Sequence, residues 1–541
     1  MRKSLSVVLL LFINSTLLFA QQQEKPKLVI GIVVDQMRQE YLFKYYDRFV
    51  DGGFKRLMQE GYMMKNAHYN YIPTYTGPGH SSIYTGTTPA NHGIIANNWY
   101  SKKLGKTIYC ASDSTVSAVG GTEENGKISP RNLLTTTITD ELMLSTNKSS
   151  KVVGIAIKDR GAALPAGHMG QAYWLDKETG EFMTSNYYRE KLPEWLIQFN
   201  QQKLPSKYLS KQWETLFPVA TYRQSISDIN DFEAPFNGKE TTDFPYNLSE
   251  LQDKNGGIGL IAATPFGNTL TLDMTYATLE GENLGNGEST DFLALSFSST
   301  DYVGHRFGPS SVELEDTYLR LDRDLEKFFT YLDENYGKDN YLLFLTADHG
   351  VADIVGYMES ENIPSGSFNS RFAQTQLKGF VQNHYGEGNW ILNISNEQIF
   401  LNRPLIREKE MDLKKIQREV ADFVLRFEGV KETYTASEMK KMEYTFGRKH
   451  LLQMGFNHKS SGDILIALEP AWLSNSYRGT SHGSGYTYDT HVPILFYGWK
   501  VKNGHSARYC TITDIAPTLS MLLNIRLPNG ATGQPILEVL D

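Results

Sequence analysis

Short apolar runs alternate along this chain with segments whose apolar residues recur at helical spacing. The runs cover residues 28–34, 152–157, 292–297, 341–345, 464–468 and 492–497. Between the third and fourth runs, apolar residues from Val312 to Leu332 repeat as in an amphipathic helix, and another helix is expected from Asp514 to Leu522. Strands buried on both faces read as continuous apolar runs. The alternation therefore predicts an α/β fold with a central, mostly parallel sheet flanked by helices.

Charged and imidazole side chains follow four of these runs. They are Asp35 after the first run, Lys158 and Arg160 after the second, Asp301 and His305 after the third, and Asp348 and His349 after the fourth. A single acid after a strand is commonly a helix cap or a turn residue. In open parallel sheets, however, ligands bind beyond the carboxyl ends of the strands. Four strands that bring such side chains to one edge predict a functional site there.

The acids and imidazoles of this edge suit a metal centre, because carboxylate oxygens and imidazole nitrogens together are typical ligands of zinc. A further candidate is His482, which lies in the glycine-rich segment 479–485. Alone, a histidine in such a segment would more often be a turn residue. Three carboxylates and three imidazoles are too many ligands for one tetrahedral ion. The pattern therefore favours two metal ions.

A candidate nucleophile lies between the first and second apolar runs. Thr76 is followed by Gly77 and Gly79, which permit close backbone approach, and the chain then enters an expected helix. A hydroxyl near a helix N-terminus faces backbone N–H groups that favour an anion. A threonine hydroxyl becomes a good nucleophile only when a metal or a base lowers its pKa. A plain helix-capping threonine is the alternative interpretation.

The chain resembles the alkaline phosphatase superfamily, and within it most closely the PafA-like bacterial phosphate monoesterases. The matching motifs occur in the family's order: Val34-Asp35-Gln36-Met37-Arg38, Thr76-Gly77-Pro78-Gly79-His80, Asn97-Asn98-Trp99-Tyr100, Ile157-Lys158-Asp159-Arg160, Asp301-Tyr302-Val303-Gly304-His305, Ala347-Asp348-His349-Gly350 and Thr480-Ser481-His482-Gly483. One such motif is unspecific, but the ordered series spans most of the chain.

The resemblance implies an alkaline phosphatase-like fold that binds two zinc ions. One ion would be held by Asp301, His305 and His482. The other would be held by Asp35, Asp348, His349 and the Thr76 oxygen. The non-bridging phosphate oxygens would be contacted by Asn97, Lys158 and Arg160. The best-known alkaline phosphatases use a serine nucleophile and a third, magnesium site; here a threonine and a Lys/Arg pair stand instead, and magnesium dependence stays open.

The implied activity is the hydrolysis of small phosphate monoesters to an alcohol and inorganic phosphate through a phospho-Thr76 intermediate. A phosphodiesterase or nucleotide pyrophosphatase of the same superfamily is the alternative, because relatives with the same metal ligands cleave diesters. Lys158 and Arg160 favour the monoester, which carries more negative charge. Sulfatase chemistry is disfavoured, since it uses a modified Cys or Ser where Thr76 stands. An inactive exported binding protein is a further alternative, although no ligand or contact residue is missing.

Charge and cysteine content exclude other classes. Lys and Arg total 53 against 61 Asp and Glu, a net charge of −8 with no basic block, which argues against a nucleic-acid surface. Cys110 and Cys510 are too few for a disulfide scaffold or a four-cysteine zinc site. They form one bridge or remain two buried thiols. No protein partner is implied.

The first twenty residues have the pattern of a secretory signal. A basic start, Arg2-Lys3, precedes an apolar run that is broken by Asn14-Ser15-Thr16 and ends before Gln21. A retained membrane anchor is the alternative. No later stretch reaches the ~20 apolar residues of a spanning helix. We therefore expect a signal peptide at residues 1–20 and a periplasmic or secreted protein.

Residues 21–541 are expected to form one catalytic domain with two insertions. The insertions cover about residues 170–255, which include a hairpin pattern at 174–182, and about residues 356–462, which include a charged helical segment at 409–427 and a hairpin at 390–401. Insertions near a strand-end site commonly cover it, so these segments would shape the pocket for the leaving group. Peripheral decoration is an equally weighted alternative.

Overall fold

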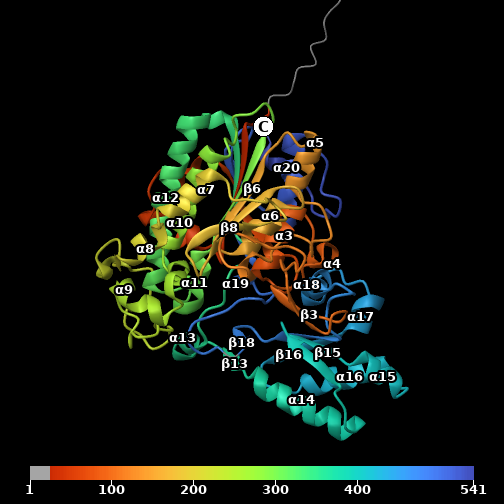
Figure 1. Ribbon diagram of the computed structural model, residues 1–541. Coiled ribbons are helices and arrows are strands. Elements are labelled where there is room, and N and C mark those ends of the chain that lie inside the picture. The colour runs from red at the N-terminus through yellow and green to blue at the C-terminus, as the bar shows by residue number, and fades with distance from the viewer. Residues whose placement is uncertain (1–24, 475, 541) are drawn as a thin grey trace, which may run out of the picture.

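The computed structural model describes residues 25–474 and 476–540, so the predicted signal peptide lies outside the described residues. A ten-stranded sheet runs through the molecule (Figure 1). Its strands, in spatial order, are β20 (Gly504–Thr511), β2 (Tyr62–His68), β19 (Ile494–Gly498), β12 (Tyr341–Thr346), β1 (Leu28–Val34), β11 (Asp291–Phe297), β6 (Val152–Ala156), β7 (Gln171–Asp176), β8 (Glu181–Ser185) and β5 (Ala118–Val119). The five strands from β12 to β7 are parallel, which confirms the predicted α/β fold.

Helices cover both faces of this sheet, so β1, β11 and β12 are buried along their whole length. Figure 1 shows two groups of helices on opposite sides: α7 (Glu194–Gln201), α10 (Phe266–Gly281) and α12 (Val312–Tyr336) against α3 (Thr76–Thr85), α5 (Ile138–Ser145), α6 (Asp159–Ala166) and α20 (Ile515–Leu523). The predicted helices at 312–332 and 514–522 are α12 and α20. Cys110 and Cys510 are both free and buried, so of the two alternatives left open by the sequence the structure has two buried thiols. Within the described chain, no helix has the length and apolar character to span a membrane.

Two apolar runs do not pair as the sequence predicted. The run at 464–468 is β17 (Ile464–Leu468), which lies in a separate four-stranded sheet with β14 (Ile391–Ser395), β15 (Gln398–Leu401) and β16 (Val430–Thr435). The last run, β19, joins the main sheet but is antiparallel to β12 and β2. Strands β2 and β20 were not expected, because polar residues interrupt both. An apolar run indicates a buried strand, whereas its partner and direction depend on residues distant in the sequence.

The segment predicted as the first insertion begins inside the main sheet. β7 and β8 form the expected hairpin and extend the sheet next to β6. After α7, the chain forms α8 (Leu204–Leu209) and a short antiparallel pair, β9 (Gln212–Trp213) with β10 (Tyr246–Asn247). Trp213 Nε1 donates to Asp316 Oδ2 at 2.9 Å, and Ser225 Oγ donates to Glu315 Oε2 at 2.7 Å. This segment therefore packs on the first turns of α12.

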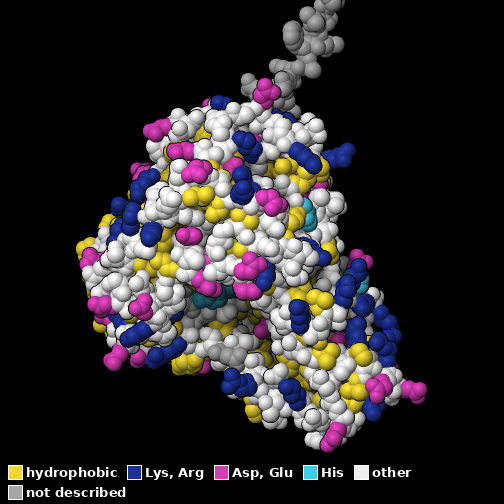
Figure 2. Space-filling model, viewed as in Figure 1, with side chains coloured by type: hydrophobic (Ala, Val, Ile, Leu, Met, Phe, Trp, Pro, Cys, Tyr) yellow, Lys and Arg dark blue, Asp and Glu magenta, His cyan; other side chains and the backbone are white. Residues whose placement is uncertain are grey.

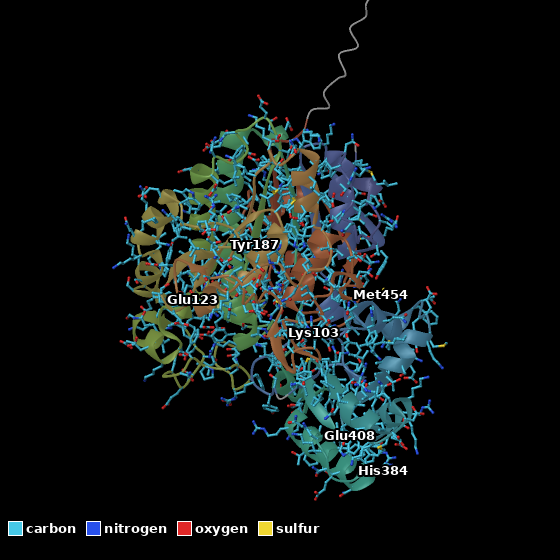
Figure 3. The ribbon with its side chains drawn as sticks, turned by 45° about the vertical axis from the view of Figure 1, so that its right-hand side comes forward. Lys103, Glu123, Tyr187, His384, Glu408 and Met454 are labelled. Carbon is cyan, nitrogen blue, oxygen red and sulfur yellow. The ribbon has the colours of Figure 1, made fainter. Side chains whose placement is uncertain are left out.

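The second predicted insertion forms most of a compact projection, residues 361–474, that we call the cap unit. The four-stranded sheet packs on α14 (Ser370–Tyr385) and α16 (Leu413–Val424), and α15 (Arg403–Glu408), α17 (Ala436–Lys441) and α18 (Gly447–Gly455) complete it. Its core is distinct from that of the main sheet. Lys103, between β3 (Asn98–Ser101) and β4 (Lys106–Tyr109), lies at the junction with the main body, whereas Glu408 lies toward the far end of the cap unit (Figure 3).

Candidate metal and nucleophile site

The carboxyl ends of β1, β11 and β12 bring the three predicted carboxylates together. Val33 of β1 pairs with Thr346, the last residue of β12, and Val34 pairs with Phe297, the last residue of β11. The three strands therefore end at one level. Asp35 follows β1 directly, Asp301 lies in the first turn of α11 (Ser299–Phe307), and Asp348 follows β12. They are 0, 4 and 0 % exposed. Buried carboxylates this close together repel one another, so the cluster requires positive charge.

Asp301, His305 and His482 form the first potential ligand group, which is the set that the family resemblance implies for one ion. Their candidate ligand atoms lie within 4.8 Å of one another. His305 Nε2 lies 3.1 Å and His482 Nε2 3.7 Å from Asp301 Oδ1. The Nδ1 atoms of the two rings face backbone oxygens, Thr480 O at 2.8 Å and Thr74 O at 2.7 Å. These contacts orient each ring with Nε2 toward the carboxylate, as second-sphere hydrogen bonds do in metal sites.

The second potential ligand group differs in part from the predicted set. It consists of Asp35, Asp301 and His349, again within 4.8 Å, and within the described residues Asp348 does not join it. Asp348 is nevertheless adjacent, with Oδ2 3.6 Å from His349 Nε2. Asp35 Oδ1 and Asp348 Oδ2 are buried and have no hydrogen-bond partner among the described residues. Buried carboxylate oxygens without partners are costly, so this donor set fits divalent ions.

Lys158 projects into the same cluster from the end of β6. Its Nζ donates to Asp35 Oδ2 at 2.6 Å and to Asp301 Oδ2 at 2.5 Å. Burial lowers the pKa of Lys158, but the charges of Asp301 and Asp35 outweigh that effect and raise it above its ordinary value. In this structure the ammonium group neutralises two of the carboxylates, and the contact with phosphate oxygens that the family resemblance implies stays a prediction.

Thr76 is the first residue of α3 and is 1 % exposed. Its Oγ1 lies 3.4 Å from His349 Nε2 and 3.4 Å from Arg160 Nη2. Asn97, which precedes β3, accepts a hydrogen bond from Gly77 N through Oδ1 at 2.7 Å. The structure therefore brings the predicted hydroxyl, guanidinium, amide and imidazole together at the start of one helix, where backbone N–H groups favour an anion.

Three residues without an assigned role complete this packing. A Cβ at Gly79 would lie 2.3 Å from the carbonyl oxygen of Asp348, so only glycine lets α3 approach that strand end. Gln36 donates through Nε2 to Asp301 Oδ1 at 2.8 Å and through its backbone N to Asp348 Oδ1 at 3.1 Å. His80 Nδ1 lies 3.4 Å from Asp348 Oδ2. All three lie inside the quoted motifs, but no spacing rule identifies their contacts.

Burial is the largest influence on the titration of these groups. It raises the pKa of Asp348 to about 6, and burial together with the charge of Asp348 raises the pKa of Asp35 well above its ordinary value. Burial lowers the pKa of His349 to about 3. Burial opposes ionisation of Asp301 too, but His305 and Lys158 hold its pKa well below the ordinary value. A neutral imidazole beside ionised carboxylate is the state that binds a divalent ion.

A cavity of about 160 Å³ separates this site from the cap unit. Its lining includes Tyr75, His482, Glu397, Arg448 and Trp472. The space-filling view shows histidine side chains at the back of a hollow between the main body and the cap unit (Figure 2). The structure thus leaves room beside the first ligand group for an organic substituent.

Comparisons with known proteins find that this chain is similar to a phosphodiesterase family and to bacterial alkaline phosphatases. The model of the type I phosphodiesterase / nucleotide pyrophosphatase family matches residues 29–492. The chain is 44% identical to alkaline phosphatase PafA of Elizabethkingia meningoseptica, over 95% of each chain. It is 44% identical to alkaline phosphatase PhoV of Synechococcus elongatus, over 96% of this chain and 94% of that one. A Myroides odoratus protein named calcium-transporting ATPase is also 44% identical, over 98% of this chain and 97% of that one.

The crystal structure of PafA superposes closely on this chain. The TM-score is 0.92 at 43% sequence identity, and the match covers 96% of this chain and 99% of PafA. A second solved structure, with the same TM-score, is of a PafA variant in which a threonine, an asparagine, a lysine and an arginine are substituted.

Proposed function

The chain belongs to the type I phosphodiesterase / nucleotide pyrophosphatase family of the alkaline phosphatase superfamily and is a PafA-like alkaline phosphatase; from this premise we propose that it is an exported, two-zinc phosphate monoesterase with Thr76 as nucleophile. Its substrates are small phosphate monoesters, and its products are an alcohol and inorganic phosphate.

The observation that carries this proposal is the environment of the Thr76 hydroxyl. Oγ1 has His349 Nε2 on one side and Arg160 Nη2 on the other, each at 3.4 Å. A nucleophile for phosphoryl transfer needs positive charge both where it ionises and where the phosphate oxygens lie. The four residue types substituted in the PafA variant recur here in the same order, as Thr76, Asn97, Lys158 and Arg160.

In the proposed reaction, the Thr76 oxygen attacks phosphorus and the bond from phosphorus to the ester oxygen breaks. The alcohol leaves with a proton, and water then cleaves phospho-Thr76 to release inorganic phosphate and restore the hydroxyl. Two zinc ions, one on Asp301, His305 and His482 and the other on Asp35, Asp348 and His349, would supply the positive charge that ionises Thr76 and stabilises the departing oxygen.

Three side chains would hold the phosphate oxygens. Arg160 Nε is buried and has no hydrogen-bond partner among the described residues, so the guanidinium retains a donor. Asn97 uses its oxygen to accept from Gly77 N, which leaves the amide N–H groups for phosphate. Lys158 now binds Asp35 and Asp301, and it would turn toward phosphate once metal charge satisfies those carboxylates.

A phosphodiesterase is the alternative, and the description of the matching family favours it. A diester carries one negative charge and a second organic group. A monoester dianion carries two charges, so additional cations stabilise its binding more. A cavity of about 170 Å³ beside Arg160 is lined by Lys158 and Lys177 as well. Asp159 also lines this cavity, so its three cations exceed its one carboxylate, and this excess of positive charge favours the monoester.

The test compares kcat/KM for an aryl phosphate monoester with that for the matching bis-aryl diester, on zinc-loaded enzyme and on a chelated control. We expect strong preference for the monoester and loss of activity on chelation. Preference for the diester would assign a phosphodiesterase, and full activity after complete metal removal would contradict the zinc assignment.

Export is tested separately. The intact mass of the protein recovered from the periplasm or the medium should correspond to a chain that begins near residue 21. A full-length, membrane-associated chain would mean that residues 1–20 are a retained anchor.

A further inference from the structure

His482 lacks the support that regular secondary structure gives to the other two histidines of the potential ligand groups. His305 belongs to α11, and His349 follows β12 by three residues. His482 lies in residues 479–486, which we call the His482 segment; they are outside every helix and strand, and three of them are glycines. Glycine makes a chain more flexible. The position of this imidazole therefore depends on hydrogen bonds that other residues make to the segment.

One carboxylate fixes the chain directly after His482. Asp489 Oδ2 accepts hydrogen bonds from Gly483 N at 3.1 Å, from Ser484 N at 2.7 Å and from Ser484 Oγ at 2.6 Å. We propose that Asp489 is a positioning residue, which holds His482 in the geometry that zinc requires. This inference rests on the proposed function, because it takes His482 as a zinc ligand.

Asp489 is itself held firmly in place. It lies in the short helix α19 (Thr487–Thr490) and is 1 % exposed. Its backbone oxygen accepts a hydrogen bond from Gly350 N at 2.8 Å. A Cβ at Gly350 would lie 2.1 Å from the backbone oxygen of Tyr488, so only glycine permits this close approach. The helix that carries Asp489 is therefore anchored to the chain directly after His349.

Asp489 thus connects the chain segments that carry His482 and His349, one residue from each potential ligand group. The two imidazole rings stack, with centroids 3.5 Å apart and an interplanar angle of 14°. His482 Nε2 also lies 3.7 Å from Asp301 Oδ1, its neighbour in the first group. A shift of the His482 segment would change the distance between these two ligand atoms, and the hydrogen bonds to Asp489 oppose such a shift.

The other contacts of the His482 segment do not replace Asp489. Thr480 donates through its backbone N to His305 O at 2.8 Å, but it precedes His482. For Gly483 and Ser484, the described residues outside the segment supply one further hydrogen bond, which Thr74 Oγ1 donates to Ser484 O at 2.9 Å. Loss of the Asp489 carboxylate would leave two backbone N–H groups and a hydroxyl without their acceptor.

The experiment measures the zinc affinity of the wild type and of Asp489→Ala by competition with a chromophoric chelator. One of the two zinc ions should bind about 10- to 100-fold more weakly, as is common when an outer hydrogen-bond partner of a metal site is lost. Affinity for the other ion should change by less than about 3-fold, because Asp35 and Asp348 follow β1 and β12 directly. Excess zinc should restore kcat/KM for an aryl monoester, since the variant lacks no reacting group.

Asp489→Asn should rescue zinc binding. Asp489 Oδ1 is buried and has no hydrogen-bond partner among the described residues, so the amide nitrogen can take its place while the amide oxygen accepts the three hydrogen bonds. Zinc affinity should stay within about 3-fold of the wild type. If Asp489→Ala does not fold, Ser484→Ala removes one of the three donors and should weaken the same zinc ion by about 5-fold. Equal losses in the Asn and Ala variants would overturn the proposal.

Asp463→Ala is the matched control for a general loss of stability. Asp463 lies in the cap unit, is 0 % exposed, and accepts hydrogen bonds from Leu401 N at 3.0 Å and Arg403 Nε at 2.8 Å. Its substitution also removes a buried carboxylate with several donors, so it should lower Tm while both zinc affinities stay those of the wild type. Equal weakening of zinc by Asp463→Ala would show that destabilisation alone explains the effect, and would overturn the proposal.

A double-mutant cycle tests whether Asp489 acts through His482. In the His482→Ala background, Asp489→Ala should weaken zinc binding by less than about 2-fold further, because the ligand that it positions is already absent. A further loss as large as that in the wild-type background would overturn the proposal. A wild type that binds no zinc would overturn the proposed function and this inference together, whereas equal zinc affinities of wild type and Asp489→Ala would overturn the inference alone.

Discussion

The strand-end site and the cap unit are held in position by different means. Asp35, Asp301 and Asp348 extend from parallel strands or the helix that follows, and none is more than 4 % exposed. The cap unit has its own core, which includes Val420 and Ile464, and a smaller apolar cluster packs its residues Leu452 and Phe456 against Ile72 of the main body. One region is fixed by the register of the main sheet, whereas the other is a separately packed body placed over it.

A single turn of the cap unit reaches the residues beside the nucleophile. Between β14 and β15, Asn396 Nδ2 donates to Asn98 O at 2.6 Å and Glu397 Oε2 accepts from Tyr75 OH at 3.2 Å. The Tyr75 ring packs edge-on against His482, with centroids 5.5 Å apart. Under the proposed function the sheet edge performs the chemistry, and we expect the cap unit to adjust it through this turn. Substitutions should therefore have large effects at the edge and small effects at the turn.

Thr76→Ala should have the largest effect, because it removes the proposed nucleophile and leaves the six protein metal ligands in place. We expect kcat for an aryl phosphate to fall by at least about 10⁴-fold while elemental analysis still finds two zinc ions per chain. Thr76→Ser should retain measurable turnover, since it keeps a hydroxyl. Thr85→Ala, at the other end of α3, is the control and should be fully active. Substantial turnover by Thr76→Ala would eliminate the phospho-threonine pathway.

Arg160→Ala should have the second largest effect and should discriminate between substrates. The guanidinium would contact non-bridging oxygens, so kcat/KM for the monoester should fall by about 10²- to 10³-fold. The diester carries less charge and should lose only about 10-fold. Arg131→Ala is the control, because Arg131 is an exposed arginine that pairs with Asp113 at 3.0 Å. Equal losses for both esters would show that Arg160 does not distinguish the dianion.

The positions of the edge residues could be predicted from the sequence because a buried strand and the side chains that follow it are both local patterns. Continuous apolar runs located β1, β11 and β12, and the residues that follow them could lie only at the edge of the sheet. The contacts of Lys158 could not be predicted in the same way. Its spacing from Arg160 suggests a phosphate contact, but the position of a flexible ammonium depends on which carboxylates lie nearest, here Asp35 and Asp301.

The cap unit shows where sequence patterns fail. The run at 464–468 was expected in the main sheet, yet it pairs with β15 and β16, because an apolar strand does not specify its partner. Glu397 had no signal at all: it lies in a hairpin turn more than three hundred residues from Tyr75, and only the folded structure brings the two together. The remaining two predictions test whether this contact matters.

Glu397→Ala should have a moderate effect. The substitution removes the acceptor of the Tyr75 hydroxyl and frees the ring that packs on His482, so kcat/KM for the aryl monoester should fall by about 10-fold. Glu397→Gln keeps an acceptor and should change kcat/KM by only about 2-fold. Glu408→Ala, at an exposed position of the cap unit, is the control. If Glu397→Ala matches the wild type in both kcat/KM and Tm, the cap unit does not influence the edge through Tyr75.

Asn396→Gly should have the smallest effect and tests whether docking of the turn matters apart from the Tyr75 contact. Asn396 has a φ of 52°, which glycine adopts without strain, so the substitution removes the hydrogen bond to Asn98 O and preserves the turn. We expect KM for the aryl monoester to rise about 2-fold with kcat unchanged, because a loosened cap unit would bind the leaving group less well. A fall in kcat instead would mean that the turn positions the nucleophile itself, and the division between a catalytic edge and an adjusting cap unit would no longer hold.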